Sequence, residues 1–69
     1  MMIYPNPSHG HFSINNVVNG SKLEIYNSTA QLIFSEIAEG SETHLHLENE
    51  PNGIYLIKCG HEIFKVVKQ

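Results

Sequence analysis

Residues 50–59 read EPNGIYLIKC and join the strongest turn signal in the chain to its most apolar segment. Proline presets φ for the second position of a β-turn, and a glycine after it tolerates positive φ. The apolar run that begins at Ile54 is short and is bounded by turn residues, which is typical of a buried strand. We therefore predict a turn over 50–53 and a central β-strand over 54–59.

The remaining segments have the same character. Short alternating runs are separated by turn residues, and no stretch shows helical periodicity. The clearest alternation is THLHL at 43–47, which places two leucines on one face and two histidines on the other. The pattern predicts an all-β sandwich or barrel. The further strands that we expect cover 11–15, 22–27, 31–37 and 62–68.

The alternation also predicts which side chains point inward. At 31–37, 53–59 and 62–68 both faces are partly apolar, and a shift of one residue exchanges the two faces. The phase chosen for these three strands is therefore the least constrained part of the prediction. The predicted core consists of Phe12, Ile14, Leu23, Ile25, Leu32, Phe34, Leu45, Leu47, Ile54, Leu56, Phe64 and Val66.

Length and composition exclude several classes of protein. The chain has 69 residues, with four Lys, no Arg, seven Glu, no Asp and a net charge of −3. This length forms one small domain. An acidic chain without arginine is a poor candidate for nucleic-acid binding. A single cysteine closes no internal disulfide. No charged region followed by a long apolar run is present, so we expect no export signal in the chain itself.

The segment Tyr4–Gly10 contains two prolines and one glycine. Each proline removes a backbone donor and biases the residue before it toward extended geometry. We therefore predict that residues 1–10 are a stiff boundary segment or linker and that residues 11–69 form the β-domain.

Four blocks of sequence resemble a known family. They are YPNPSHGHFSI at 4–14, LEIYNSTAQLI at 23–33, NGIYLIKC at 52–59 and FKVVKQ at 64–69. In this order and spacing they are similar to the type A C-terminal sorting domain of the type IX (Por) secretion system of Bacteroidetes. The chain departs from the family at Ala30, where glycine is usual, and a positive φ there would cost about 1 kcal/mol. The motif positions are Tyr4, Pro5, Asn6, Pro7, Gly10, Phe12, Gly53 and Tyr55.

The resemblance implies a fold and a role. It implies a small Ig-like antiparallel β-sandwich of six to seven strands that acts as a sorting signal for a larger cargo located upstream. It implies an outer-membrane translocon and a sortase-like peptidase as partners. It implies a periplasmic location in transit, followed by the cell surface or secretion. It implies no catalysis and no cofactor.

Within this hypothesis, we interpret the prolines and glycines of the motif as architectural, that is, as residues that set the backbone conformation and do not contact a partner. The apolar strand near the end of the chain is the candidate for recognition, because an edge strand can accept a partner strand. The residues concerned are Lys65, Val66, Val67 and Lys68. The alternative, an ordinary strand with solvent-facing lysines, stays open. We also expect weak self-association through edge strands.

Other chemistry has weaker support in the sequence. His9-x-His11 and His44-x-His46 are two pairs with ligand-like spacing, but they are far apart in the sequence and His9 lies in a turn, so we predict no metal site. Cys59 and His61 flank a turn glycine with nothing to orient them, so we predict no catalytic site. The alternative function is a small carbohydrate-binding or adhesive module, which a patch of exposed tyrosines would favour.

Overall fold

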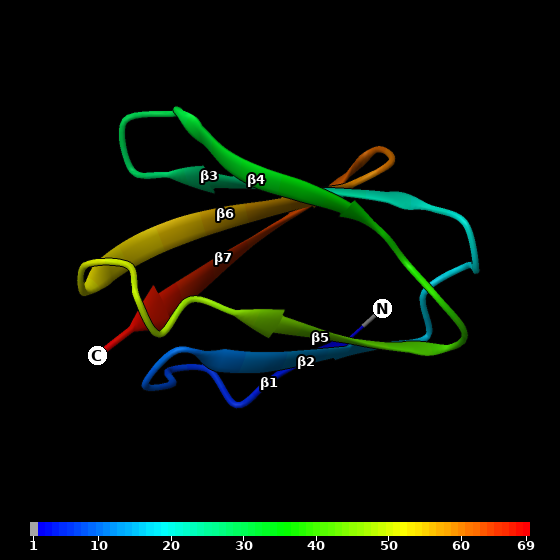
Figure 1. Ribbon diagram of the computed structural model, residues 1–69, viewed down its shortest axis with the longest axis horizontal. Coiled ribbons are helices and arrows are strands. Elements are labelled where there is room, and N and C mark those ends of the chain that lie inside the picture. Colours follow the sequence, from blue (N-terminus) through cyan, green and yellow to red (C-terminus); the bar gives the residue numbers. More distant parts are fainter. Residues whose placement is uncertain (1) are drawn as a thin grey trace.

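The computed structural model describes residues 2–69 and contains two antiparallel sheets, stacked as two layers (Figure 1). Residues 2–69 include no helix, and therefore none long and apolar enough to cross a membrane. The predicted all-β fold class is confirmed. The strands are β1 (Met2–Tyr4), β2 (His11–Asn15), β3 (Lys22–Asn27), β4 (Leu32–Ile37), β5 (Glu42–His46), β6 (Gly53–Cys59) and β7 (Glu62–Lys68).

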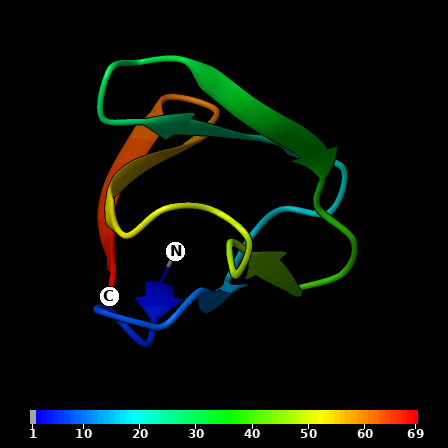
Figure 2. The ribbon, with the colours of Figure 1, turned by 60° about the vertical axis from the view of Figure 1, so that its left-hand side comes forward.

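The strand order is that of an Ig-like sandwich. One sheet has the order β1-β2-β5, and the other has the order β4-β3-β6-β7. In Ig-like folds the first, second and fifth strands also share a sheet, and the third, sixth and seventh strands share the other. The fourth strand extends this second sheet, as in variable-type domains. Figures 1 and 2 show the two layers from two directions.

Tyr55 anchors the turn before β6. Its ring is buried, and its hydroxyl donates to the carbonyl oxygen of Pro51, four residues upstream. This is the tyrosine corner that characterises Ig-like sandwiches. Burial, and secondarily the charge of Glu50, raises the pKa of the phenol above its ordinary value. Tyr55 therefore joins the core to the segment that leads into β6. The hydrogen-bonded turn lies at 47–50, where the N–H of Glu50 donates to the carbonyl of Leu47 at 3.0 Å, and not at the predicted 50–53, because Gly53 already belongs to β6.

The core lies between the two sheets. The predicted alternation is correct for β2, β3 and β5 and for Val66, all of whose inward side chains are buried. Phe34 and Phe64, also predicted as core, are half-buried. The buried apolar residues are Phe12, Ile14, Val17, Leu23, Ile25, Ala38, Leu45, Leu47, Tyr55, Ile57 and Val66.

The predicted phase of β6 is wrong. Tyr55 and Ile57 point inward, whereas Ile54 is 44% exposed and Leu56 is half-buried on the outer face. The tyrosine corner explains this result, because the ring of Tyr55 must enter the core for its hydroxyl to reach Pro51. The aromatic residue, and not the two aliphatic residues beside it, sets the register of the strand.

Leu32 is also misplaced in the predicted core, since its side chain is 52% exposed. The pairing of β3 with β4 shifts between Ile25 and Tyr26: Ile25 lies opposite Phe34, and Tyr26 lies opposite Leu32. The extra residue, Ile33, forms a bulge, and a bulge changes the phase of the strand on one side of it. Leu32 consequently shares the outer face with Tyr26.

The turn between β3 and β4 is built by Asn27. Its side-chain oxygen accepts hydrogen bonds from the backbone N–H groups of Thr29 and Gln31, each 3.0 Å long. The turn requires a left-handed residue before Gln31, and Ala30 has φ +65°. The positive φ considered at this position is thus present, with alanine where glycine would adopt it at no steric cost.

Candidate recognition surface

Residues 5–8 lie against the end of β7, although nearly the whole chain separates them in sequence. The backbone N–H of Ser8 donates to the carbonyl of Val67 at 3.0 Å, and the N–H of Gln69 donates to the carbonyl of Ser8 at 2.7 Å. Figures 1 and 2 show the loop that follows β1 beside the C-terminal end of β7. We call residues 5–8 the prolyl clamp.

Asn6 gives the prolyl clamp its second pair of hydrogen bonds. Its side-chain Nδ2 donates to the carbonyl of Lys65 at 3.2 Å, and its Oδ1 accepts from the N–H of Val67 at 2.9 Å. The side-chain amide thereby offers one donor and one acceptor to the edge of β7, as a residue of a neighbouring strand would. Pro5 and Pro7 flank this amide, are exposed and are both preceded by cis peptide bonds.

Gly10 fixes the other end of this segment. It has φ +134°, and its carbonyl accepts a hydrogen bond of 2.6 Å from the N–H of Leu47. A Cβ atom at this position would lie 2.8 Å from Cα of Glu48. Only glycine allows the two backbones to approach so closely. These contacts support the architectural interpretation of the motif.

Residues 2–10, predicted as a boundary segment, contact β2, the end of β7 and the residue after β5. β1 pairs with β2, and Ile3 packs against the core. Ser8 is buried, and its hydroxyl donates to the carbonyl of His11 at 2.6 Å. The hydrogen bonding therefore shows no break at residue 10.

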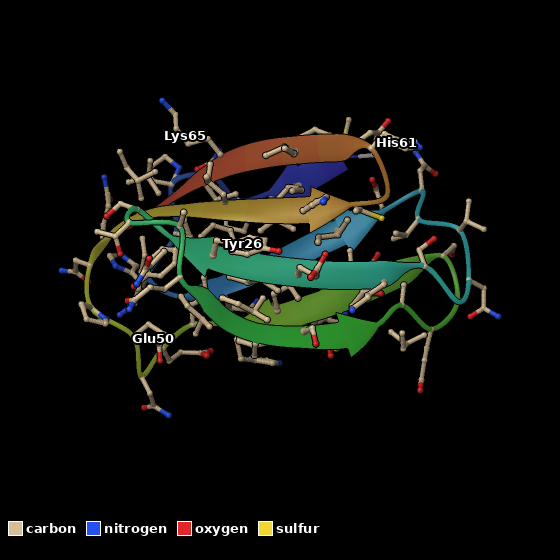
Figure 3. The ribbon with its side chains drawn as sticks, turned by 90° about the horizontal axis from the view of Figure 1, so that it is seen from above. Tyr26, Glu50, His61 and Lys65 are labelled. Atoms are coloured by element: carbon tan, nitrogen blue, oxygen red, sulfur yellow. The ribbon has the colours of Figure 1, made fainter. Side chains whose placement is uncertain are left out.

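The four residues predicted for recognition alternate along β7. Val66 is 0% exposed and Lys68 only 8%, because both side chains point into the sandwich. The ammonium group of Lys68 donates to the carbonyls of Glu48, at 3.2 Å, and Glu50. Lys65 is exposed and Val67 is half-buried on the outer face. Of the two lysines predicted for recognition, only Lys65 is therefore exposed to solvent (Figure 3).

One part of the edge of β7 is uncovered. The prolyl clamp binds residues 65, 67 and 69, alternate positions whose backbone groups face away from β6. Ile63 occupies the next position on this edge, and its side chain is 63% exposed. Within residues 2–69, only β6 pairs with β7 before Lys65. We call residues 62–64 the open edge.

The tyrosines do not form the patch that a carbohydrate-binding module would need. Tyr4 belongs to the three-stranded sheet, and Tyr26 lies on the outer face of the four-stranded sheet, where Figure 3 shows it over the central strands. Tyr55 is buried. The hydroxyl of Tyr26 donates to Glu24 at 3.1 Å. Desolvation, followed by this carboxylate, raises the pKa of Tyr26 above its ordinary value.

Cys59 and His61 do not form a reactive pair in the described chain. Cys59 is a free thiol, half-buried and packed against the core. His61 is exposed in the turn between β6 and β7 (Figure 3). The contacts of Cys59 agree with its interpretation as a small apolar residue of the strand end.

The strand order and the clamped terminal strand define a small Ig-like sandwich domain. The family model described as "Secretion system C-terminal sorting domain" matches residues 2–69. The chain therefore belongs to the family of secretion system C-terminal sorting domains. No curated protein matches the chain.

Membership of this family fixes the general role of the domain. It is a type IX secretion sorting signal, attached to an upstream cargo and recognised by the secretion machinery. The family is not catalytic. A signal of this type implies export to the cell surface or secretion. The match begins at Met2, so β1 and the prolyl clamp fall within the family's domain.

Proposed function

We propose that an outer-membrane translocon binds the folded domain at the open edge of β7 and thereby directs the attached cargo from the periplasm across the outer membrane. After the cargo has crossed the outer membrane, a sortase-like peptidase cleaves the domain from it. The supporting observation is the division of one strand edge: Asn6 and Ser8 cover it from Lys65 onward, while Ile63 is exposed.

Strand addition is the mode of recognition that this edge favours. Backbone groups of an edge strand supply affinity to an extended partner, and alternate side chains supply specificity. The side chains of Ile63 and Lys65 share the outer face of β7, so a partner strand that adds at 62–64 would meet one apolar group and, beside it, one positive charge. Val66 and Lys68 contribute from the interior, by holding the strand in place.

The experiment fuses the domain to a reporter that carries a signal peptide, in a strain with the type IX system. We expect the wild-type fusion at the cell surface and a fusion lacking residues 63–69 in the periplasm. This deletion also removes Val66 from the core, so it tests the strand and the fold together. Surface export of the deleted fusion would contradict the proposal.

A charge reversal separates recognition from folding. Lys65→Glu changes an exposed residue of β7, and Lys22→Glu makes the same change on the outer face of β3. Exposed substitutions of this kind leave the melting temperature nearly unchanged. We expect slower export for Lys65→Glu and normal export for Lys22→Glu. Equal export of both variants would exclude Lys65 from the contact.

A further inference from the structure

Three histidines gather on the outer face of the three-stranded sheet. β2 and β5 pair in a register that places His11 opposite His46 and Ser13 opposite His44. The ring centroid of His11 lies 5.2 Å from that of His44 and 5.1 Å from that of His46. The sheet therefore brings one histidine of the first His-x-His pair, His11, together with both histidines of the second pair.

His9 takes no part in this cluster. Its ring nitrogen Nδ1 lies 3.2 Å from the carbonyl oxygen of Gln69, at the end of β7. The three clustered histidines thus come from β2 and β5 alone, and all three are exposed.

Two carboxylates accompany the cluster. Oε1 of Glu42 lies 3.2 Å from Nε2 of His44, and Oε2 of Glu48 lies 3.3 Å from Nδ1 of His46. Metal-binding histidines usually have one ring nitrogen bonded to a carboxylate or carbonyl, which orients the ring and leaves the other nitrogen for the ion. The second nitrogen of His44 lies 3.1 Å from Oγ of Ser13, a neutral and exchangeable partner.

We propose that His11, His44 and His46 form a surface site for a borderline divalent metal ion such as Zn²⁺. Imidazole nitrogen is a preferred donor for such ions, and three protein ligands with one open position make a common zinc arrangement. Glu48 and Glu42 serve as outer partners of the two β5 imidazoles. The site lies on the sheet opposite the one that carries β7, so it is independent of the proposed sorting contact.

Binding requires the rings to turn. The rings of His11 and His44 are stacked with an interplanar angle of 11°. In this conformation no three His, Cys, Asp or Glu side chains of residues 2–69 are positioned to hold a metal ion. The rings are exposed, so rotation about their side-chain torsions meets little packing. A bound ion would draw one ring nitrogen of each histidine toward a common point.

The test titrates the 69-residue chain with ZnCl₂ near neutral pH, with MgCl₂ as the control ion. Binding is followed by calorimetry and by the NMR signals of the histidine rings. We expect the ring signals of His11, His44 and His46 to shift when Zn²⁺ is added and to stay unchanged when Mg²⁺ is added. Movement only at His9 or His61, or no zinc binding, would overturn the proposal.

Variants assign the ligands. His11→Asn and His46→Asn should each weaken zinc binding at least about ten-fold, and Glu48→Gln should weaken it by a comparable or smaller factor. His61→Asn is the matched control, because His61 is equally exposed and lies in the turn after β6. Loss of binding in Cys59→Ser, or equal affinity of His46→Asn and His61→Asn, would contradict the assignment. If a variant unfolds at a lower temperature than the wild type, the zinc titration of the wild-type histidine signals decides whether the site exists.

Discussion

The two edge strands of the four-stranded sheet, β7 and β4, differ in whether their outer backbone edges are paired. On β7 the prolyl clamp bonds to the backbone from Lys65 onward. On β4, within the described chain, the only neighbouring strand is β3, and the exposed side chains include Leu32 and Ile37. Edge strands left unpaired are sites where another strand can add. The comparison shows that the prolyl clamp covers the end of the β7 edge and leaves the open edge, residues 62–64, accessible.

The strongest disruption of this contrast is expected from Gly10→Ala, which displaces the segment that ends the prolyl clamp. Its Cβ would meet backbone atoms of Glu48 at 2.8 and 2.9 Å, at a positive φ. We expect a loss of about 3 kcal/mol in unfolding free energy from strain and overpacking. Urea denaturation measures it. Gly20→Ala, with positive φ and no atom within 4 Å of the added Cβ, should lose only about 1 kcal/mol.

The two lysines of β7 should differ in the same assay. Lys68→Met removes the ammonium group that donates to the carbonyls of Glu48 and Glu50, and we expect a loss of about 2 kcal/mol. Lys65→Met changes an exposed side chain and should stay within about 0.5 kcal/mol of the wild type. Equal stabilities of the two variants would mean that Lys68 does not hold the turn at 48–50.

Asn6→Ala opens the clamped edge without touching the core. It removes two hydrogen bonds to β7, at Lys65 and Val67, and should cost about 1 kcal/mol. Hydrogen exchange should show faster exchange of the Val67 amide, while the amides of the core strands β3 and β6 keep their relative protection. Asn49→Ala, an exposed substitution outside the prolyl clamp, is the control. Unchanged protection of Val67 would contradict the bonding of Asn6.

The smallest expected effect lies beside the uncovered strand β4. Ala30 has φ +65°, so Ala30→Gly should relieve strain and raise the unfolding free energy by about 0.5 kcal/mol. The gain is small because glycine also increases the entropy of the unfolded chain. Thr29→Gly, at the neighbouring position without a positive φ, should instead destabilise the domain in the same urea denaturation.

The sequence predicts the elements better than their phase. Strict alternation, as at Leu45 and Leu47, identifies the inward face because only one face is apolar. In β6 both faces are apolar, and the deciding contact of Tyr55 with Pro51 depends on a turn conformation that hydrophobicity does not encode. The register shift that exposes Leu32 arises from a bulge in β4. A bulge adds one residue to a strand, and the alternation of apolar residues does not predict where this happens.

For the proposed recognition surface, the sequence predicts a strand and the structure adds which of its residues are accessible. The family resemblance directs attention to the last strand, and alternation alone would have placed Val66 and Lys68 on the face opposite Lys65. The prolyl clamp could not be foreseen, because it joins Asn6 to Val67 across almost the whole chain. The histidine cluster depends likewise on the pairing of β2 with β5, which brings His11 opposite His46.

The most direct measurement compares two exposed isoleucines on opposite edges of the same sheet. Ile63, 63% exposed, lies on the open edge of β7, and Ile37, 55% exposed, lies on β4. A lysine on an edge strand opposes the addition of another strand. In the reporter fusion, Ile63→Lys should leave the reporter in the periplasm, while Ile37→Lys reaches the cell surface as the wild type does. Normal surface export of a folded Ile63→Lys fusion would contradict recognition at the open edge.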